Sequence, residues 1–186
     1  MPRIFFALDL PEKIKDNLVQ LQLKIPHASS AVKLVERGNL HLTLLFCGEV
    51  TDEALQQMLL QAQAAARAFS CFTVSIGGVG VFPSPSRPRV FWAGVREGGE
   101  QLTRLAAALS RAVGIVPGNP FSPHLTLGRV RQGKRASSGS FLEQKDFFAG
   151  IFTADRFFCL ESTLTRHGPV YTKVREFMLA GQVPEK

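Results

Sequence analysis

The sequence predicts an α+β fold made of two related β-α-β units with a pseudo-twofold relation between them. The segment RIFFALDL at residues 3–10 is echoed by RVFWAGVR at 89–96. The tetrapeptide His-Leu-Thr-Leu occurs at 41–44 and again at 124–127, and it follows the first segment at near-equal spacing in both copies. Two matches in the same order indicate duplicated supersecondary units, since chance similarity has no reason to keep order and register.

Each unit carries an amphipathic segment between its two expected strands, at residues 12–25 and 100–113. The apolar positions are Ile14, Leu18, Leu21 and Ile25 in the first, and Leu102, Leu105, Leu109 and Val113 in the second. This spacing is typical of a helix with one buried face. A further helix is expected over 52–69, which is rich in Ala, Gln and Leu, with Thr51 or Asp52 placed to cap it.

The remaining apolar segments predict additional strands. Residues 72–82 and 152–163 form a weaker third pair, and the segment 161–179 reads as two strands turned at Gly168 and Pro169. The glycines after Ile76 match no nucleotide-binding loop, so we expect them to serve a bulge or tight packing.

We expect a single domain, residues 1–186, made of two intertwined lobes. The lobe of the first motif is expected around 40–82 and that of the second around 89–130, with C-terminal strands at 152–179. The Pro- and Ser-rich segment 83–88 is expected to be an extended connector at the boundary between the lobes.

The composition is that of a globular protein, with 45% hydrophobic and 20% charged residues, which excludes disorder as a description of the whole chain. No apolar stretch approaches the length that spans a bilayer, and the N-terminal apolar run is too short for a signal peptide. The three cysteines show no C-x-x-C spacing and have apolar neighbours, so we expect buried free thiols, a reducing compartment and a cytoplasmic protein.

Positive charge is concentrated in the second half of the chain. Residues 87–186 carry 15 Lys and Arg against 8 Asp and Glu, whereas 1–86 carry 7 of each, within a net charge of +7. Such asymmetry suits a polyanionic partner, although many globular proteins are mildly basic without one. The basic, Gly- and Ser-rich segment 131–140 could grip nucleic acid, but a solvated loop is the interpretation we favour.

The duplicated motif places one imidazole and one hydroxyl on the same side of each strand. On a strand, residues i and i+2 share a face, so His41 projects with Thr43, and His124 with Thr126. If the pseudo-symmetry brings the two strands together, the two imidazoles face one another across a cleft, a phosphate's width apart.

Two imidazoles and two hydroxyls suit phosphodiester chemistry without a metal. A neutral imidazole can accept a proton from water, an imidazolium can protonate a leaving oxygen, and histidine alone has an ordinary pKa that allows both near neutrality. No metal or cofactor site is indicated, because there is no H-x-x-x-H and no Cys pair. His27 and His167 lack such a companion threonine and are expected to be surface or loop residues.

With two H-x-T-x motifs, the chain resembles the 2H phosphoesterase superfamily. The segments RIFFALDLP, NLHLTLLFCGEV, FSPHLTLGRV and LESTLTRHGPVYTKVREF are closer still to its bacterial and archaeal RNA 2′,3′-cyclic phosphodiesterases, long called 2′-5′ RNA ligases. The resemblance implies a bilobal α+β fold in which two antiparallel sheets flank a central cleft, with helices outside. It also implies hydrolysis of a terminal 2′,3′-cyclic phosphate of RNA to a 2′-phosphate, and weak reversible 2′-5′ ligation of tRNA halves.

By the same resemblance, His41 is the proton donor to the leaving 3′ oxygen and His124 is the proton acceptor from water. The residues themselves do not decide this direction, because the two motifs are identical. Arg129 matches the basic residue that often follows the second motif in that family. We expect no cofactor, no membrane partner and a monomer.

Three further positions bear on the site. Strict alternation from His124 puts Arg129 on the opposite face, so Arg129 reaches the cleft only if the strand ends or bulges near Gly128. By the same alternation, Phe46 is expected in the core and not under a nucleobase. Tyr171 and Phe121 could stack on a base, but packing explains them equally.

Two other functions stay open on sequence grounds. The same two histidines could act on a small cyclic phosphate or on a 2′-5′ oligonucleotide. Alternatively, the basic second half could belong to an RNA-binding module whose histidines are not catalytic.

Overall fold

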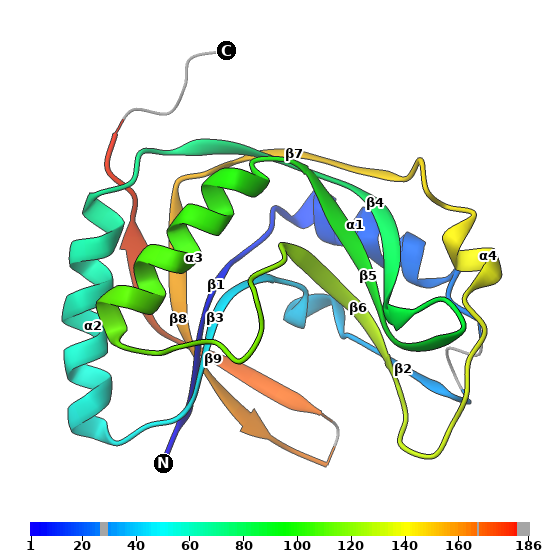
Figure 1. Ribbon diagram of the computed structural model, residues 1–186, viewed down its shortest axis with the longest axis horizontal. Coiled ribbons are helices and arrows are strands. Elements are labelled where there is room, and N and C mark those ends of the chain that lie inside the picture. Colours follow the sequence, from blue (N-terminus) through cyan, green and yellow to red (C-terminus); the bar gives the residue numbers. More distant parts are fainter. Residues whose placement is uncertain (27–29, 167, 182–186) are drawn as a thin grey trace.

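The strands of the two repeated units lie in two different antiparallel sheets of the computed structural model, which describes residues 1–26, 30–166 and 168–181 (Figure 1). The four-stranded sheet has the order β3 (Leu42–Glu49), β1 (Arg3–Leu8), β8 (Arg156–Leu164) and β9 (Pro169–Met178). The five-stranded sheet has the order β2 (Val32–Leu34), β6 (His124–Val130), β5 (Arg87–Glu97), β4 (Phe72–Ser84) and β7 (Phe148–Ala154). Each motif strand pairs with the first strand of its own repeat, β3 with β1 and β6 with β5. The predicted α+β fold with two related units is confirmed.

The predicted helices form close to their expected bounds. The helices are α1 (Glu12–Gln22), α2 (Asp52–Arg67), α3 (Gly99–Val113) and the short α4 (Gly139–Leu142), with a 3₁₀ turn η1 (Arg37–Asn39). The first helix ends three residues before the expected Ile25, which is nevertheless buried. Thr51 is the capping residue of α2, because its hydroxyl accepts a hydrogen bond of 3.2 Å from the backbone N–H of Ala54.

The helix of each repeat packs against the sheet of the other repeat. Helix α1 follows β1 in the chain, yet it lies against β6 and β7 of the five-stranded sheet, where Asn17 Nδ2 donates to the Ala149 carbonyl at 2.7 Å. Helix α3 follows β5, yet it packs against β3 and against α2 on the side of the four-stranded sheet (Figure 1). The two units are therefore interlocked.

A buried glutamine anchors the end of α1 to the second motif strand. The Gln22 side chain is 4% exposed, and its amide donates to the carbonyl of Val35 at 2.7 Å and to that of Leu127 at 2.8 Å. Leu127 is the last residue of the second His-Leu-Thr-Leu motif, so a helix of the first repeat holds the strand of the second.

The segment 83–88 is the end of a β-hairpin and not a connector between lobes, so this expectation was wrong. Strands β4 and β5 pair up to Ser84 and Arg87, next to each other in one sheet. Prolines are tolerated at strand ends, where their missing N–H removes no ladder bond, and this is where Pro83 and Pro88 lie. As a result, β4 belongs to the same sheet as the strand of the second motif.

The glycines of β4 serve irregular pairing and tight packing, as expected. Gly78 has a positive φ of 74° within an irregular stretch of the pairing between β4 and β5. A Cβ on Gly80 would lie 2.0 Å from the ring of Trp92, so only glycine lets this ring lie flat against the strand.

One hydrophobic core joins both sheets, with Phe6 and Leu42 from one and Phe91 and Leu125 from the other all at most 1% exposed. The cysteines are free, but only Cys159 is buried. Cys47 and Cys71 are half-buried, so the expectation of three buried thiols was only partly right. Within the described residues, no helix has the length and apolar character needed to cross a membrane.

Candidate active site

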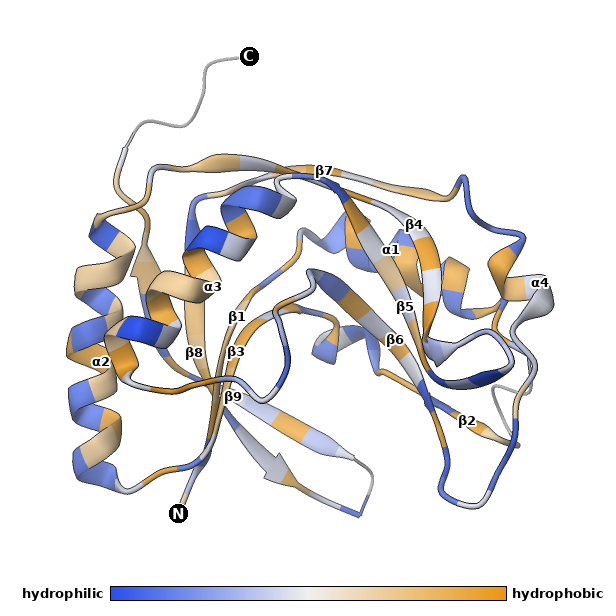
Figure 2. Cartoon of the chain, viewed as in Figure 1, coloured by the Kyte–Doolittle hydropathy of each residue, from blue (hydrophilic) through white to orange (hydrophobic). Residues whose placement is uncertain are grey.

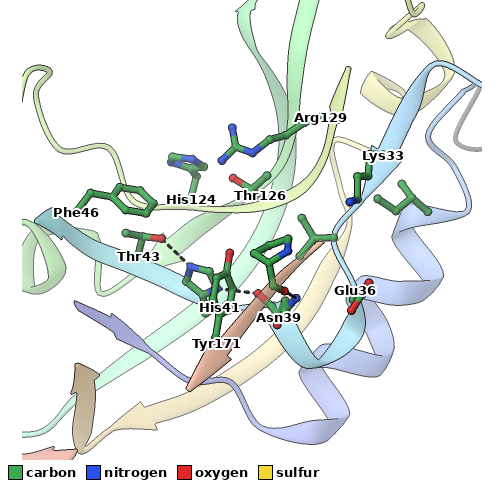
Figure 3. A pocket seen from close by; sticks show the side chains of 13 residues that line it. Lys33, Glu36, Asn39, His41, Thr43, Phe46, His124, Thr126, Arg129 and Tyr171 are labelled. Atoms are coloured by element: carbon green, nitrogen blue, oxygen red, sulfur yellow. Dashed lines mark hydrogen bonds between the residues drawn. The ribbon is translucent and has the colours of Figure 1, made fainter. Parts of the chain in front are cut away.

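Both His-x-Thr motifs border one pocket between the two sheets. The pocket has a volume of about 200 Å³, and β3 and β9 contribute to it from one sheet and β2 and β6 from the other (Figure 3). Its polar and aromatic lining is Lys33, Glu36, Asn39, His41, Thr43, Phe46, His124, Thr126, Arg129 and Tyr171. The sequence-predicted set, which is the two histidines, the two threonines and Arg129, is thus brought together.

The two imidazoles are held in the same way. His41 Nδ1 lies 2.7 Å from the carbonyl oxygen of Asn39, and His124 Nδ1 lies 2.7 Å from that of Ser122. A carbonyl oxygen can only accept, so each Nδ1 carries the hydrogen. Each neutral ring therefore keeps Nε2 free of hydrogen, available to accept a proton, and each cationic ring has an Nε2–H to give.

The two threonines differ in their contacts. The Thr43 hydroxyl lies 2.9 Å from His41 Nε2, so this hydroxyl is the hydrogen-bond partner of the first imidazole (Figure 3). Thr126 borders the same pocket from β6. Hydroxyls at these positions can donate to the non-bridging oxygens of a phosphate.

Aromatic rings surround His41. The ring of Phe5 is 5.1 Å away between centroids, and the ring of Tyr171 is 5.3 Å away and edge-on. Burial lowers the pKa of His41 below its ordinary value. The Asn39 carbonyl and the Asp9 carboxylate oppose this effect, while Arg129 reinforces it.

Aromatic rings also surround His124. Phe82 lies 5.1 Å away and edge-on, and Trp92 lies 6.4 Å away. Burial lowers the pKa of His124 as well, the carbonyl of Ser122 opposes this, and Arg129 lowers it further. Both rings are therefore neutral imidazoles in the free protein at neutral pH. The negative charge of a bound phosphate would favour their protonation.

Arg129 reaches the pocket because β6 contains a bulge. On the partner strand β5, Trp92 pairs with Thr126 and Phe91 pairs with Gly128, which leaves Leu127 as an extra residue. The extra residue reverses the alternation after the motif, so Arg129 lies on the same face as His124. The condition set by the sequence, a bulge near Gly128, is met.

Phe46 also reaches the pocket, and the expectation that it lies in the core was wrong. Its side chain is 64% exposed, and it borders the pocket beside Thr43. The cause is a matching bulge in β3, where Ala7 pairs with Thr43 and Phe6 pairs with Leu45, so that Leu44 is the extra residue. Phe46 is thus the counterpart of Arg129, five residues after the histidine in each motif.

Of the other two aromatics considered from sequence, Tyr171 borders the pocket and Phe121 does not. Phe121 instead lines a broader neighbouring hollow between β3, α3 and the loop 116–122, which shares Thr43, Phe46 and His124 with the pocket.

Sequence reasoning missed Lys33 and Asn39. Lys33 pairs with Arg129 across β2 and β6 and borders the pocket beside it. Asn39 holds His41 through its carbonyl, and its Nδ2 donates to the Pro169 carbonyl at 2.8 Å. A backbone carbonyl can come from any residue type, so the sequence does not mark it. In both motifs, however, the carbonyl that holds the histidine belongs to the residue two positions before it.

His27 and His167 lie outside the described residues. Within the described ranges, no three side chains of His, Cys, Asp and Glu gather as a metal site would require.

Comparison with known proteins points to one family. The chain matches the LigT-like phosphoesterase family over residues 8–92 and 94–171. It is 36% identical over 178 residues to the RNA 2′,3′-cyclic phosphodiesterase of Archaeoglobus fulgidus, covering 94% of this chain and 99% of that one.

Solved structures agree with this match. A crystal structure of a Thermus thermophilus protein is 34% identical with a TM-score of 0.79, covering 97% of this chain and 100% of that chain. A crystal structure of Escherichia coli LigT complexed with 3′-AMP is 27% identical with a TM-score of 0.78 and the same coverage.

Proposed function

Because the chain belongs to the LigT-like phosphoesterase family, whose members at 31–37% identity are RNA 2′,3′-cyclic phosphodiesterases, we propose that it hydrolyses the 2′,3′-cyclic phosphate at the end of an RNA to a 2′-phosphate. The observation that carries the proposal is the pair of imidazoles with like tautomers, His41 and His124, bordering one pocket with two hydroxyls and a guanidinium.

In the proposed reaction, His124 is the base and His41 the acid. Nε2 of neutral His124 takes a proton from water as the water oxygen attacks phosphorus. Nε2–H of cationic His41 gives its proton to the 3′ oxygen as the P–O3′ bond breaks. The products are a free 3′ hydroxyl and a 2′-phosphate, and proton exchange with solvent restores both rings. General acid and base catalysis each contribute roughly a hundredfold to ten-thousandfold.

The remaining pocket residues would bind the phosphate and the terminal nucleoside. Arg129 would balance the charge that develops on the phosphate oxygens, while Thr43 and Thr126 would donate to its non-bridging oxygens. Phe46 presents an exposed ring beside the pocket, which suits stacking on a nucleobase.

The RNA chain beyond the terminal nucleotide would follow the basic end of the five-stranded sheet. Lys33 and Arg129 pair there across two strands, and the loop after β6 carries Arg131, Lys134 and Arg135. This loop is hydrophilic along most of its length (Figure 2). Cationic side chains gain by displacing counterions from RNA phosphates, so binding through them would weaken with salt.

The same site also suits a second reaction, the ligation of RNA ends. A site that opens the cyclic phosphate with water can also open it with the 5′ hydroxyl of a second RNA by the same proton transfers, which is 2′-5′ ligation, and the reverse proton transfers cleave that bond again. We infer that tRNA halves are one substrate, that the protein acts in the cytoplasm, and that it works as a monomer.

Product analysis tests the proposal. An oligonucleotide with a 2′,3′-cyclic phosphate end is expected to become a 2′-phosphate in the presence of EDTA, with a bell-shaped pH profile from the coupled histidines. His41→Ala and His124→Ala are each expected to lose at least about a hundredfold in turnover. Full activity in both variants would contradict the two-histidine reaction.

Two other outcomes would point elsewhere. Faster turnover of a mononucleoside 2′,3′-cyclic phosphate than of an RNA end would favour a small-molecule phosphodiesterase. Tight, salt-sensitive RNA binding without any product would favour a non-catalytic RNA-binding module.

A further inference from the structure

The two halves of the site differ in the residue that lies beside each histidine on the neighbouring strand. In β5, Gly94 pairs with His124. In β1, Leu8 pairs with Leu42 in antiparallel register, so the next residues along the two strands, Asp9 and His41, come level with each other. The first histidine therefore has a carboxylate as its neighbour, and the second has no side chain there at all.

Asp9 and His41 also border the same small cavity. Its volume is about 70 Å³, and it lies between β1, β8, β9 and the turn before β3. His41 Nδ1 is already bonded to the Asn39 carbonyl, so Asp9 can act on the ring only through the electric field across this space.

The carboxylate is held firmly in place. Lys15 Nζ lies 2.8 Å from Oδ1, the backbone N–H of Leu10 donates to the same oxygen at 2.9 Å, and Lys173 Nζ donates to Oδ2 at 3.2 Å. Lys15 is itself only 6% exposed. Burial opposes ionisation of Asp9 most strongly, but the hydrogen bonds of Lys15 and Leu10 hold its pKa below the ordinary value, so Asp9 is an anion at neutral pH.

We propose that Asp9 sets the direction of proton transfer in this site, by favouring the cationic form of His41 and so making His41 the acid and His124 the base. Asp9 is a positioning residue that acts through His41 and does not touch the substrate. The inference rests on the proposed two-histidine hydrolysis and adds what the two identical motifs cannot provide, a reason for their different roles.

The charges around each ring support this assignment. The charged and titratable groups that face His41 or share a cavity with it are Asp9 just after β1, Lys15 from α1, Lys33 and Glu36 from β2 and its following turn, His124 and Arg129 from β6, and Tyr171 and Lys173 from β9. Burial has the largest effect on the pKa of His41 and lowers it, and Asp9 is the carboxylate that raises it. For His124, burial and Arg129 lower the pKa, and in the described part of the chain only the carbonyl of Ser122 raises it.

The test uses two substitutions with opposite expected effects. Asp9→Asn removes the anion, so the alkaline limb of the turnover profile, which reports the acid His41, is expected to move to lower pH. Turnover on that limb is expected to fall by roughly threefold to tenfold. Lys15→Met removes a buried cation that disfavours cationic His41, and is expected to move the same limb to higher pH. Loss of structure alone would not move the limb in opposite directions.

Glu12→Gln is the matched control. Glu12 also binds Lys15, at 3.3 Å, but it is outside both cavities that His41 borders, so this variant is expected to keep the profile of the unchanged protein. NMR titration of the His41 ring in the free variants is expected to show shifts of the same signs.

Three results would overturn the inference: an unmoved profile in Asp9→Asn, a shift of its acid limb instead of its alkaline limb, or unchanged titration of His41. Failure of the proposed function is a separate result, since it would appear as no product from the unchanged protein. In that event the NMR titration still decides whether Asp9 favours the cation of His41.

Discussion

Each imidazole of the site is oriented by a backbone carbonyl two residues earlier in the chain, from Asn39 in one motif and Ser122 in the other. The two residues differ in identity and act through the main chain, so comparing the two motifs by their side chains does not reveal this contact. Because the acceptor is the main chain, the tautomer of His41 and His124 is fixed by the path of the strand and survives substitution of either neighbour.

Thr43 gives a first prediction at this scale. Its hydroxyl is 2.9 Å from His41 Nε2, the atom assigned to proton transfer. Thr43→Val keeps the shape but removes the hydroxyl, and is expected to lower kcat for the cyclic phosphate by about tenfold to a hundredfold. Thr43→Ser keeps the hydroxyl and is expected to stay within a fewfold of the unchanged protein. Equal losses in the two variants would show that the hydroxyl is not what matters.

Arg129 gives a second prediction, which concerns the direction in which the pKa values of the two histidines change. Its charge lowers the pKa of both His41 and His124, so Arg129→Gln is expected to raise both values in the free protein, as followed by NMR. The same variant is expected to lose about a hundredfold to a thousandfold in kcat/KM, because in the proposed reaction Arg129 balances the charge that develops on the phosphate. Arg104→Gln, on the exposed face of α3, is the control and should change neither measurement.

At the scale of elements, the two motif strands share a bulge that the sequence shows only indirectly. Leu44 and Leu45 are both 3% exposed, and Leu127 and Gly128 are both buried, so two successive residues face the core in each strand. Two adjacent apolar residues where alternation demands one polar residue are the available signal for such a bulge.

The bulge explains why one prediction from the sequence was met and its counterpart failed. Strict alternation correctly placed each histidine on the same face as its threonine, because each strand is regular between these two residues. Strict alternation failed for Phe46, because the bulge at Leu44 brings Phe46 to the face of His41. The equivalent bulge at Leu127 brings Arg129 to the face of His124, and this was the condition stated for Arg129.

The sequence shows that the two units are repeated, but it does not show which residues of β1 and β5 occupy equivalent positions. Matching RIFFALDL to RVFWAGVR aligns Ala7 with Ala93, whereas the pairing of each with its motif strand makes Ala7 the counterpart of Trp92. A shift of one residue exchanges the two faces of a strand. Because both faces of these strands carry hydrophobic residues, the hydrophobic pattern does not reveal the shift. The crossing of α1 and α3 to opposite sheets was equally undetectable, because amphipathic spacing states that a helix has a buried face and not which sheet it meets.

Gln22 gives a prediction for the link between α1 and the second motif strand. Gln22→Met keeps volume and helix propensity but leaves the carbonyl of Val35 without the donor shown here, and is expected to lower the free energy of unfolding by about 1 to 3 kcal/mol. Urea unfolding followed by the fluorescence of Trp92, the single tryptophan, measures it. Gln20→Met, on the exposed side of the same helix, is expected to stay within about 0.5 kcal/mol.

For the whole molecule, the two half-buried histidines of the site make stability depend on pH. Their pKa values in the folded protein lie below the ordinary 6.5, so the folded state binds fewer protons than the unfolded state at mildly acidic pH. Stability is therefore expected to be full above about pH 6.5 and to fall as the pH drops below it.

Thermal unfolding between about pH 7.5 and pH 5 checks this dependence, since ordinary carboxyl groups stay ionised in that window. His41→Gln and His124→Gln remove one titrating ring each and are expected to flatten the change of Tm with pH, and the double variant should flatten it most. A decline just as steep in the double variant would place its origin outside this site.

The crossed helices have a consequence for motion. In a two-lobed enzyme whose halves are packed separately, the lobes can swing about a hinge and close over the substrate. Here α1 is anchored through Gln22 to the strand of His124, and α3 is packed on the strand that follows His41. Swinging the sheets apart would pull each helix out of the shared core. We therefore expect the distance between the two imidazoles to be set when the chain folds, so that the substrate meets a gap whose width changes little on binding.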